Sequence, residues 1–479
     1  KEGKLKAKDI TNDTIIFVGE DNLHYEKFAD GSVKCIEDEV PFGLPDGWAW
    51  VRLGNLSAAI QYGLSNSAEP QGTHRLLRIT DIQDGKVDWN AVPFTTVNDP
   101  EAYLLKTGDI VFARTGATVG KSFLITETPY PSVYASYLIR IRLLGSLSPE
   151  YIYQFFDSAC YWSQITDKSV GVGQPNCNGT SLKELFIPLP PISEQLRIVP
   201  TAQALLAYVA KIDAEKKSLL SIIMATKSKI LDLAIRGQLI PQDPNDEPAS
   251  VLLERIRAEK EELIKQGKIK RDKKESVIFR GEDNSYYEKM ADGKLHCLDD
   301  QLPFELPDGW EWCNLSMIGT TNIGLTYRPT DIEPGGIMVL RSCNIVNDQV
   351  DLNDLVRVKT TVRENQFAQK NDILICARNG SRSLVGKCAL IPDLGEPASF
   401  GAFMAIYRTE YFEFIVHYLR SSFFRSVFDD SNSTAINQLT QDMLKRAIVP
   451  LPPLSEQRRI VEAIGAMLFE LNQIEKSLS

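Results

Sequence analysis

Residues 114–122 read RTGATVGKS and contain residue types that could bind a phosphate, because two glycines precede a lysine and a serine. A nucleotide-binding P-loop needs four residues between its glycines, and only three separate Gly116 from Gly120. In the matching turn of the second half, five residues separate Gly380 from Gly386, and a cysteine replaces the Ser or Thr that would bind magnesium. Either spacing moves the backbone amides away from the phosphates, so we do not predict nucleotide hydrolysis.

The residues needed for other reactions are not arranged for catalysis either. The eight cysteines include no C-x-x-C pair and the four histidines lie far apart, so the spacing predicts no metal site. A methyltransferase would carry an N-P-P-[FY] motif, whereas this chain has Leu-Pro-Pro at 189–191 and 451–453. Neither a Ser/His/Asp nor a Cys/His set occurs twice, although the surrounding sequence does. We therefore predict a non-catalytic protein, and the isolated cysteines are typical of a cytoplasmic one.

The polar residues of the same turns fit contacts with DNA. Arginine and lysine bind guanine edges or phosphates, and asparagine binds adenine. The whole chain has a net charge of −10, and residues 41–190 hold 11 basic and 13 acidic residues, so any DNA-binding surface must be local. For any single residue of this kind, a solvated turn is the alternative. The candidate DNA-binding residues are Arg114, Thr115, Lys121, Arg328, Arg378, Asn379, Ser381, Arg382 and Lys387.

The segments that must position these turns occur twice in the chain. Residues 17–35 and 279–297 read FVGEDNLHYEKFADGSVKC and FRGEDNSYYEKMADGKLHC. The segments PFGLPDGWAW at 41–50 and PLPPISEQLRIV at 188–199 also return 262 residues later, the second with ten of twelve residues identical. Between these segments the offset drifts to 264 and most side chains differ. The chain is therefore a tandem duplication in which the framework segments are repeated and the loops between them differ. This pattern indicates two domains that have the same function but act on different targets.

Both repeats end in a helix with a heptad pattern. From Ser193, apolar residues recur at intervals of four and three, and the pattern returns after the second PLPP segment. This spacing favours a helix pair over an ordinary core helix, while Pro200 should kink the first helix or shift its start. Gly237 can end that helix. The predicted seam of the helix pair is Ile198, Leu205, Val209, Ile212, Leu219, Ile223, Leu233, Ile460, Ile464, Met467 and Leu471.

The segments 41–192 and 303–454 have a different pattern. They carry short β-rich runs separated by Gly, Pro, Asn and Asp turns. Each also has an apolar helical stretch near its end, around 151–156 and 412–424. We therefore predict an α+β protein with two compact, loop-rich domains.

Three features together resemble the specificity subunit of type I restriction-modification systems. They are the repeated P-L-P-P-[IL]-S-E-Q-x-R-I-V, the L-P-D-G-W-x-W opening, and the segment GQLIPQDP at 237–244. The resemblance covers essentially the whole chain. It implies two α/β target-recognition domains with pseudo-two-fold symmetry, separated by long antiparallel coiled-coil helices. Each domain is then expected to read one half of a bipartite, asymmetric DNA site, with the helices setting the spacer.

The same resemblance implies partners and cofactors. Two modification (methyltransferase) subunits are expected to dock on the helices, and restriction (translocase/endonuclease) subunits join that core on double-stranded DNA. S-adenosylmethionine and ATP with magnesium are expected on those partners, and this chain is expected to bind no cofactor itself. A duplicated protein-binding scaffold without DNA specificity is the alternative.

The resemblance and the repeat together predict the domain boundaries. Residues 1–8 look like the tail of a helix whose other copy begins near Ser250, so we expect a truncated N-terminus. No run of 18 apolar residues occurs, so no membrane-spanning segment is expected. The predicted segments are 1–40 as a helix remnant and hairpin linker, 41–192 as the first recognition domain, 193–275 as a central helical region, 276–302 as a linker hairpin, 303–454 as the second recognition domain, and 455–479 as a C-terminal helix.

Overall fold

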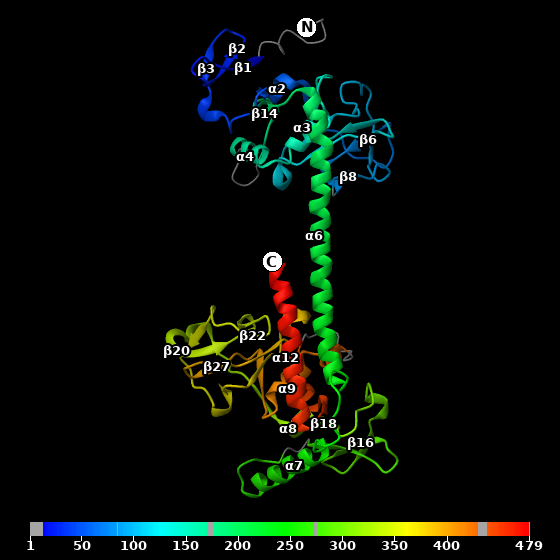
Figure 1. The fold of residues 1–479 in the computed structure, drawn as a ribbon, viewed down its shortest axis with the longest axis vertical. Helices are drawn as coiled ribbons and strands as arrows, with labels where there is room; N and C mark the ends of the chain where they lie inside the picture. The colour runs from blue at the N-terminus through cyan, green and yellow to red at the C-terminus, as the bar shows by residue number, and fades with distance from the viewer. Residues whose placement is uncertain (1–12, 84, 170–175, 272–274, 430–437, 479) are drawn as a thin grey trace. The chain divides into compact units, whose positions relative to one another are not determined.

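The computed structural model describes residues 13–83, 85–169, 176–271, 275–429 and 438–478 (Figure 1). The predicted helix tail at residues 1–8 lies outside this part of the chain. The chain forms two compact units, Lys1–Ile212 and Asp213–Ser479, which are described separately.

The first unit begins with a small antiparallel sheet of three strands, β1 (Thr14–Val18), β2 (His24–Phe28) and β3 (Val33–Cys35). Asn22 and Gly31 have positive φ angles of 61° and 88° and make the two hairpin turns. Next, β4 (Ala49–Arg52) pairs antiparallel with β14 (Phe186–Leu189), so the repeated segments at 41–50 and 188–199 meet in space.

The α+β domain of the first unit lies between these two strands. Its principal sheet has the order β11-β10-β13-β5, and a smaller sheet has the order β12-β6-β9. The strands are β5 (Ser57–Tyr62), β6 (His74–Leu77), β7 (Ile82–Gln83), β8 (Lys86–Val87), β9 (Phe94–Thr95), β10 (Ile110–Ala113), β11 (Ser122–Leu124), β12 (Ser132–Tyr134) and β13 (Leu138–Leu143). The helices are α2 (Leu53–Leu56), α3 (Pro149–Phe155), α4 (Ala159–Lys168) and α5 (Gly179–Lys183).

Strand β10 is central to the core of the first unit because all four of its residues are buried. Ile110 and Phe112 pack with α3 and the following helices, whereas Val111 and Ala113 pack on the opposite face. Alternate strand residues point to opposite faces, so a continuous apolar run marks a strand covered on both sides. The second unit repeats this arrangement in strand β25 (Ile373–Cys376).

The α+β domain of the second unit has a similar order of elements, and its two main sheets contain more strands. Its principal sheet has the order β19-β28-β25-β26-β22-β21, beside a four-stranded sheet β23-β20-β27-β24. The strands are β15 (Ser276–Arg280), β16 (Tyr286–Met290), β17 (Leu295–Cys297), β18 (Glu311–Asn314), β19 (Thr320–Ile323), β20 (Ile332–Leu340), β21 (Ile345–Val346), β22 (Gln349–Val350), β23 (Val356–Val358), β24 (Phe367–Ala368), β26 (Cys388–Leu390), β27 (Ala398–Phe400), β28 (Met404–Arg408) and β29 (Ile448–Leu451). The helices are α7 (Ala249–Lys265), α8 (Leu315–Ile318), α9 (Phe412–Arg420), α10 (Ser422–Asp429), α11 (Gln441–Arg446) and α12 (Leu454–Ser477).

Helix α6 (Ile192–Ile235) is the longest helix of the described chain, with 44 residues. It begins one residue before the predicted N-cap, and Pro200 lies within it, so the proline does not shift the start of the helix. Gly237 follows its end with a φ of +67°, and a Cβ atom there would come within 2.5 Å of the Pro307 ring. Gly237 therefore both ends the helix and permits close packing against the second unit's domain.

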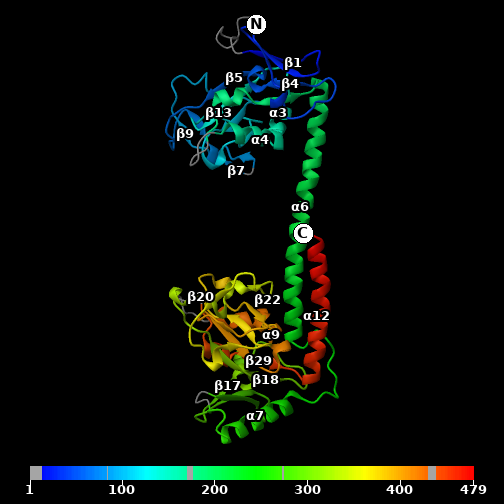
Figure 2. The same cartoon turned by 90° about the vertical axis from the view of Figure 1, so that its left-hand side faces the viewer.

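In the second unit, the last part of α6 lies antiparallel beside α12 (Figure 2). Ile230 and Ala234 share a buried cluster with Ile460 and Ile464. Farther along, Lys227 forms an ion pair with Glu475. The antiparallel helix pair predicted from the heptads is thus present in this unit.

The predicted seam is only partly buried. Side chains toward the middle of α6 are exposed because the contact with α12 involves the last turns of α6, and a heptad pattern does not tell how far a partner helix extends. Of the predicted seam residues, the structure buries Ile223, Ile460 and Ile464, half-buries Ile198, Leu233 and Leu471, and exposes Leu205, Val209, Ile212, Leu219 and Met467.

Candidate nucleic-acid interface

The predicted contact residues of the first repeat lie on the turn that joins β10 to β11. Arg114 follows β10, Thr115 precedes a 3-10 turn, and Lys121 directly precedes β11. Gly116 and Gly120 have φ angles of 74° and 89°, and a Cβ atom at Gly120 would lie 2.5 Å from the Trp162 ring. The two glycines that resemble a P-loop are therefore explained by a tight turn packed on an aromatic ring.

The turn between β25 and β26 carries the corresponding residues of the second repeat: Arg378, Asn379, Ser381, Arg382 and Lys387. The Asn379 Oδ1 accepts a hydrogen bond from the Ser381 backbone N–H at 3.0 Å. The Oγ atoms of Ser381 and Ser383 lie 2.8 Å apart and share a hydrogen bond. These bonds shape the turn, and Arg378, Ser381 and Arg382 are exposed on it.

Strand register brings aromatic side chains to the same end of the first principal sheet. Ala113 pairs with Leu138 and Ile139 pairs with Tyr62, so the ends of β10, β13 and β5 meet there. The Arg114 guanidinium lies 4.9 Å from the centre of the Tyr62 ring. The Arg114 backbone N–H donates to the Tyr137 carbonyl at 3.1 Å, and the Tyr137 side chain is 64% exposed.

The second principal sheet repeats this arrangement. Cys376 pairs with Met404, which places the turn after β25 beside the residue that precedes β28. The Arg378 backbone N–H donates to the Phe403 carbonyl at 3.0 Å, and its guanidinium lies 5.6 Å from the Phe403 ring centre. Phe403 is 61% exposed. Each repeat therefore places an arginine against an aromatic ring, Arg114 on Tyr62 and Arg378 on Phe403. The backbone N–H of each arginine is also bonded to the carbonyl of an exposed aromatic residue, Tyr137 or Phe403, and we call these two groups the arginine–aromatic ends.

The sequence interpretation missed Tyr62, Tyr137 and Phe403. The available signal was an aromatic residue immediately before the last long strand of each domain, at Tyr137 and Phe403. Neither lies in a segment of high identity between the repeats, so the repeat comparison did not draw attention to them.

Arg328 lies on a different element from the other candidates. Its backbone N–H donates to Asp331 Oδ2 at 2.7 Å and caps a short 3-10 turn, and its side chain is exposed. The segment before it is joined to the loop that carries Phe403 by a bridge between Leu325 and Gly401. The Leu325–Gly401 bridge therefore connects the segment of Arg328 to the loop of Phe403, but Arg328 itself does not lie on the β25–β26 turn.

At the end of each principal sheet that is opposite the arginine–aromatic end, an arginine forms an ion pair with a buried aspartate. Buried Asp109 accepts hydrogen bonds from Arg142 at 2.6 and 2.7 Å, and buried Asp372 accepts them from Arg408 at 2.6 and 2.7 Å. Hydrogen bonding to the carboxylate raises the pKa of each arginine. Among the described residues, no carboxylate forms an ion pair with Arg114 or Arg378, so both guanidiniums at the arginine–aromatic ends can pair with an anion.

An arginine with an adjacent exposed aromatic ring suits recognition of nucleic acid. The guanidinium can donate two hydrogen bonds to guanine or bind a phosphate, and the ring can stack on a base or pack on a sugar. In the described part of the chain, no three His, Cys, Asp or Glu side chains are grouped as metal ligands. No helix of that part is long and apolar enough to cross a membrane.

Comparison with known proteins finds the same duplication. Residues 45–222 and 307–478 both match the family described as the type I restriction modification DNA specificity domain. The chain is 26% identical to the EcoAI specificity subunit of Escherichia coli, over 92% of this chain and 80% of that protein. It is 24% identical to the EcoEI specificity subunit of Escherichia coli, over 93% and 82%.

Solved structures resemble the fold at low sequence identity. A chain from a study of complex assembly and conformational transition of the type I R-M system matches with a TM-score of 0.60 and 19% identity, over 91% of this chain and 94% of that one. The HsdS subunit of Thermoanaerobacter tengcongensis matches with a TM-score of 0.51 and 20% identity, over 91% and 92%.

Proposed function

The chain belongs to the family of type I restriction-modification DNA specificity subunits, and from this premise we propose that each of its two recognition domains reads one half of a bipartite, asymmetric DNA site. The observation that carries the proposal is the pair of arginine–aromatic ends, which occupy the same place in two sheets of related topology. The loops around them differ between the repeats, so the two half-sites should differ.

The residues of the β10–β11 and β25–β26 turns supply the contacts in this proposal. Arg114 and Arg378 bind base edges or phosphates beside Tyr137 and Phe403. Thr115, Lys121, Asn379, Ser381, Arg382, Lys387 and Arg328 add further polar contacts along the duplex. Because residues 41–190 carry 11 basic and 13 acidic residues, DNA binding depends on these few local cationic contacts, and the number of them that bind phosphates should set how steeply the affinity falls with added salt.

The chain is not itself a catalyst in this proposal. Two modification (methyltransferase) subunits dock on its helices, and restriction (translocase/endonuclease) subunits join that core. S-adenosylmethionine and ATP with magnesium are bound by those partners. The two helices α6 and α12 support the helical part of this proposal, because they pack antiparallel in the second unit.

Exchange of one recognition domain tests the proposal. Residues 41–190 are replaced with the equivalent domain of a relative, and the chimera is assembled with the modification subunits. Methylated positions are then mapped in DNA. One half of the recognised sequence should change while the other half and its methylation stay the same. A simultaneous change of both halves would refute independent reading, and methylation without any sequence preference would favour the protein-binding scaffold.

A further inference from the structure

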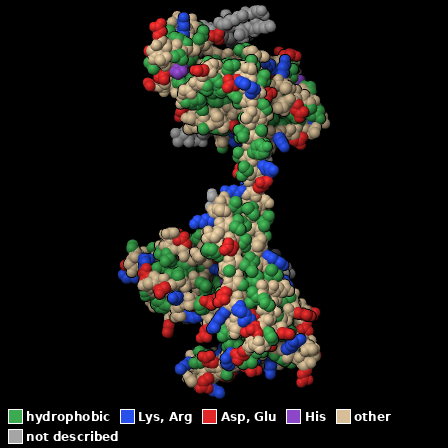
Figure 3. All heavy atoms as spheres, viewed as in Figure 1, with side chains coloured by type: hydrophobic (Ala, Val, Ile, Leu, Met, Phe, Trp, Pro, Cys, Tyr) green, Lys and Arg blue, Asp and Glu red, His purple; other side chains and the backbone are tan. Residues whose placement is uncertain are grey.

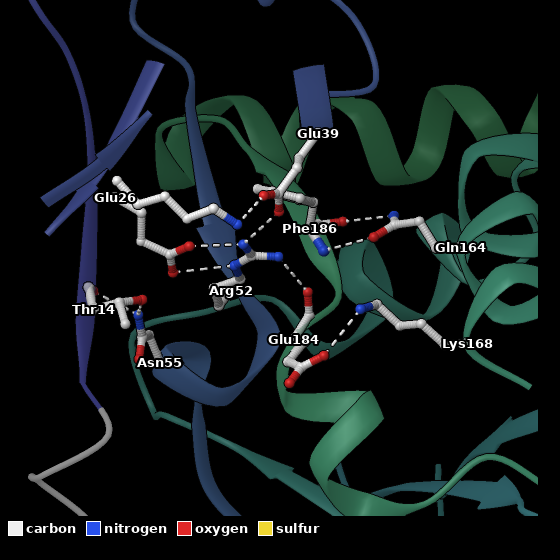
Figure 4. Close-up of polar contacts among 10 residues, drawn as sticks. Thr14, Glu26, Glu39, Arg52, Asn55, Gln164, Lys168, Glu184 and Phe186 are labelled. Atoms are coloured by element: carbon white, nitrogen blue, oxygen red, sulfur yellow. Dashed lines mark hydrogen bonds and ion pairs between the residues drawn. The ribbon is translucent and has the colours of Figure 1, made fainter. Parts of the chain in front are cut away.

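The two small sheets, β1-β2-β3 and β15-β16-β17, have an inner face that is fixed to the neighbouring domain. In the first sheet, buried Glu26 accepts hydrogen bonds from Arg52 Nε at 3.1 Å and Nη2 at 2.7 Å (Figure 4). The Arg52 guanidinium also lies 3.7 Å from the Phe186 ring centre and donates to the Glu184 carbonyl at 2.7 Å. A paired and hydrogen-bonded carboxylate of this kind holds the sheet in one orientation on the domain.

The second sheet is fixed by different chemistry at the same place. Glu288, the counterpart of Glu26, accepts hydrogen bonds from Ser276 Oγ at 2.5 Å and from Asn314 Nδ2 at 3.1 Å. Asn314 stands where the first repeat has Arg52. Both repeats therefore attach the inner face through the same glutamate position, but the ion pair with Arg52 in the first repeat is replaced by neutral hydrogen bonds in the second.

The outer face of each sheet presents five equivalent positions to solvent or to a partner. A sixth position differs, because Ile15 is exposed in the first sheet whereas its counterpart Val277 packs against the core of the second unit. Register aligns Phe17 with Tyr25 and Cys35, and the ring centres of Phe17 and Tyr25 are 5.8 Å apart. The rings of Phe279 and Tyr287 stack in the same way at 6.0 Å. We call five residues of each sheet the outer patches: Phe17, Tyr25, Lys27, Val33 and Cys35 in the first sheet, and Phe279, Tyr287, Lys289, Leu295 and Cys297 in the second.

The outer patches agree between the repeats better than the inner faces do. Four of the five outer positions are identical, and the fifth exchanges Val33 for Leu295. Of the five inner positions that are buried or half-buried in both repeats, only Ile16/Ile278 and Glu26/Glu288 are identical. A sheet that served folding alone would keep its packed inner face and let its outer face change. The reverse pattern indicates that the outer patches themselves bind something.

The charge around the patches excludes DNA as the natural occupant. Residues 14–40 contain seven acidic and two basic residues, and residues 276–302 contain six acidic and three basic residues. Phosphates are repelled by such a surface. An apolar centre with an acidic surround complements a protein surface that has an apolar centre and a Lys/Arg rim.

We propose that the two outer patches are equivalent docking sites for two copies of one protein subunit with such a basic-rimmed surface, and that this subunit is the modification subunit of the proposed function. Two matching patches on one chain provide two equal sites, which suits a partner present twice. The proposal rests on the proposed function for the identity of the partner, and it adds a surface made of residues other than those of the α6–α12 pair and the DNA-contact turns.

Charge substitutions in one patch test the proposal by stoichiometry. The full chain carrying Phe17→Arg and Val33→Arg is titrated with purified modification subunit, and the mass of the complex is measured. The first site should weaken at least tenfold, so complexes with one modification subunit should replace those with two at concentrations that saturate the wild type. Adding Phe279→Arg and Leu295→Arg should weaken both sites.

Val18→Arg is the matched control. Val18 lies on the same strand as Phe17, is also exposed, and corresponds to Arg280 in the second repeat, so the fold accepts arginine there. This variant should bind two modification subunits as the wild type does. Circular dichroism and thermal unfolding of all variants verify that the chain is folded.

A thiol footprint gives an independent readout without substitutions. Cys35 and Cys297 are exposed in the two patches, and Cys343 is exposed elsewhere in the second unit. Saturation with the modification subunit should slow maleimide labelling of Cys35 and Cys297 at least tenfold and leave Cys343 unchanged. Unaltered labelling of both patch cysteines in a complex with two modification subunits would overturn the docking sites while leaving the proposed function intact. Failure of the wild-type chain to bind the modification subunit would overturn both.

Discussion

The indole Nε1 of Trp310 donates a hydrogen bond to Glu456 Oε2 at 3.0 Å, and the same bond joins Trp48 to Glu194 at 3.2 Å. Each tryptophan comes from the L-P-D-G-W-x-W segment that opens a recognition domain, and each glutamate comes from the S-E-Q segment that starts the following helix. The repeated sequence motifs are thus two sides of one contact, which fixes the domain's first strand to its last helix.

The Trp310–Glu456 contact should contribute measurably to the stability of the second unit. Both side chains are buried, so Trp310→Phe leaves the carboxylate without its indole donor. We expect a loss of roughly 1–2 kcal/mol in the free energy of unfolding, measured by urea denaturation of the full chain. Trp48→Phe, at the more exposed counterpart, should cost less. Equal losses at the two sites would contradict the role assigned to burial.

Glu456 should also give the unit a recognisable pH dependence. Burial raises the pKa of Glu456 above the ordinary value of 4.5, although hydrogen bonds from Trp310 and Gln242 oppose the change. The folded state then binds more protons than the unfolded state as pH rises from 4.5 through the raised pKa, so stability from this residue decreases over that interval. Glu456→Gln retains an acceptor for Trp310 and should remove this decrease. An identical pH profile in the variant would exclude the effect.

His417 should act in the opposite direction. Burial, and then the charge of Arg420, lowers the pKa of His417 from 6.5 to about 4. The unfolded chain therefore binds the extra proton first, and stability is lost as pH falls from 6.5 toward 4, by up to roughly 3 kcal/mol. His417→Gln should lose this part of the acid sensitivity in urea unfolding, whereas His296→Gln, at an exposed histidine, should keep it.

The arginine–aromatic ends should affect one half-site each. Arg378→Ala should weaken specific binding by roughly 1–3 kcal/mol if the guanidinium binds a base, and Phe403→Ala should weaken it by a similar amount through lost stacking. Selection from a randomised duplex library with the complete methyltransferase should show relaxed preference in the second half-site alone. A uniform loss with a smaller salt slope would assign Arg378 to a phosphate instead, and Arg382→Ala extends the same test along the turn. Lys370→Ala is the control, because this exposed lysine precedes β25 and so lies at the opposite end of that strand from the β25–β26 turn.

The length of α6 should influence the gap between half-sites. Seven residues inserted after Ala225 preserve the heptad register and lengthen the helix by about 10 Å, and the insertion precedes the Lys227–Glu475 ion pair, so the contact with α12 from that point is retained. A library with fixed half-sites and variable gaps should then select a longer gap. Seven residues inserted after Gly145, in an exposed turn, should leave the preferred gap unchanged. A folded variant that still selects the original gap would show that helix length does not set it.

Sequence periodicity and repetition predicted the main features of the fold and placed the candidate turns, but they could not give the extent of contact. The repeat located both β-rich domains, and the β-rich run at 110–113 forms a strand, although its burial on both faces is seen only in the structure. The positions that the sequence could not provide depend on strand register. Tyr137 joins Arg114 only because β13 pairs with β10, and no spacing along the chain reports that pairing. The extent of a helix pair is also missing from the sequence. Leu205 and Val209 share the apolar pattern of Ile223 but are exposed, because α12 contacts only the last turns of α6.

Those exposed positions have a practical consequence for anyone preparing the protein. Hydrophobic side chains are visible along α6 in Figure 3, and Leu205, Leu206, Tyr208, Val209 and Ile212 are all exposed within two turns of that helix. A continuous apolar strip of this kind favours self-association and adsorption in dilute buffer. The chain produced alone should therefore show a concentration-dependent sedimentation coefficient and poor recovery, and co-production with the proposed modification subunits should yield a monodisperse sample.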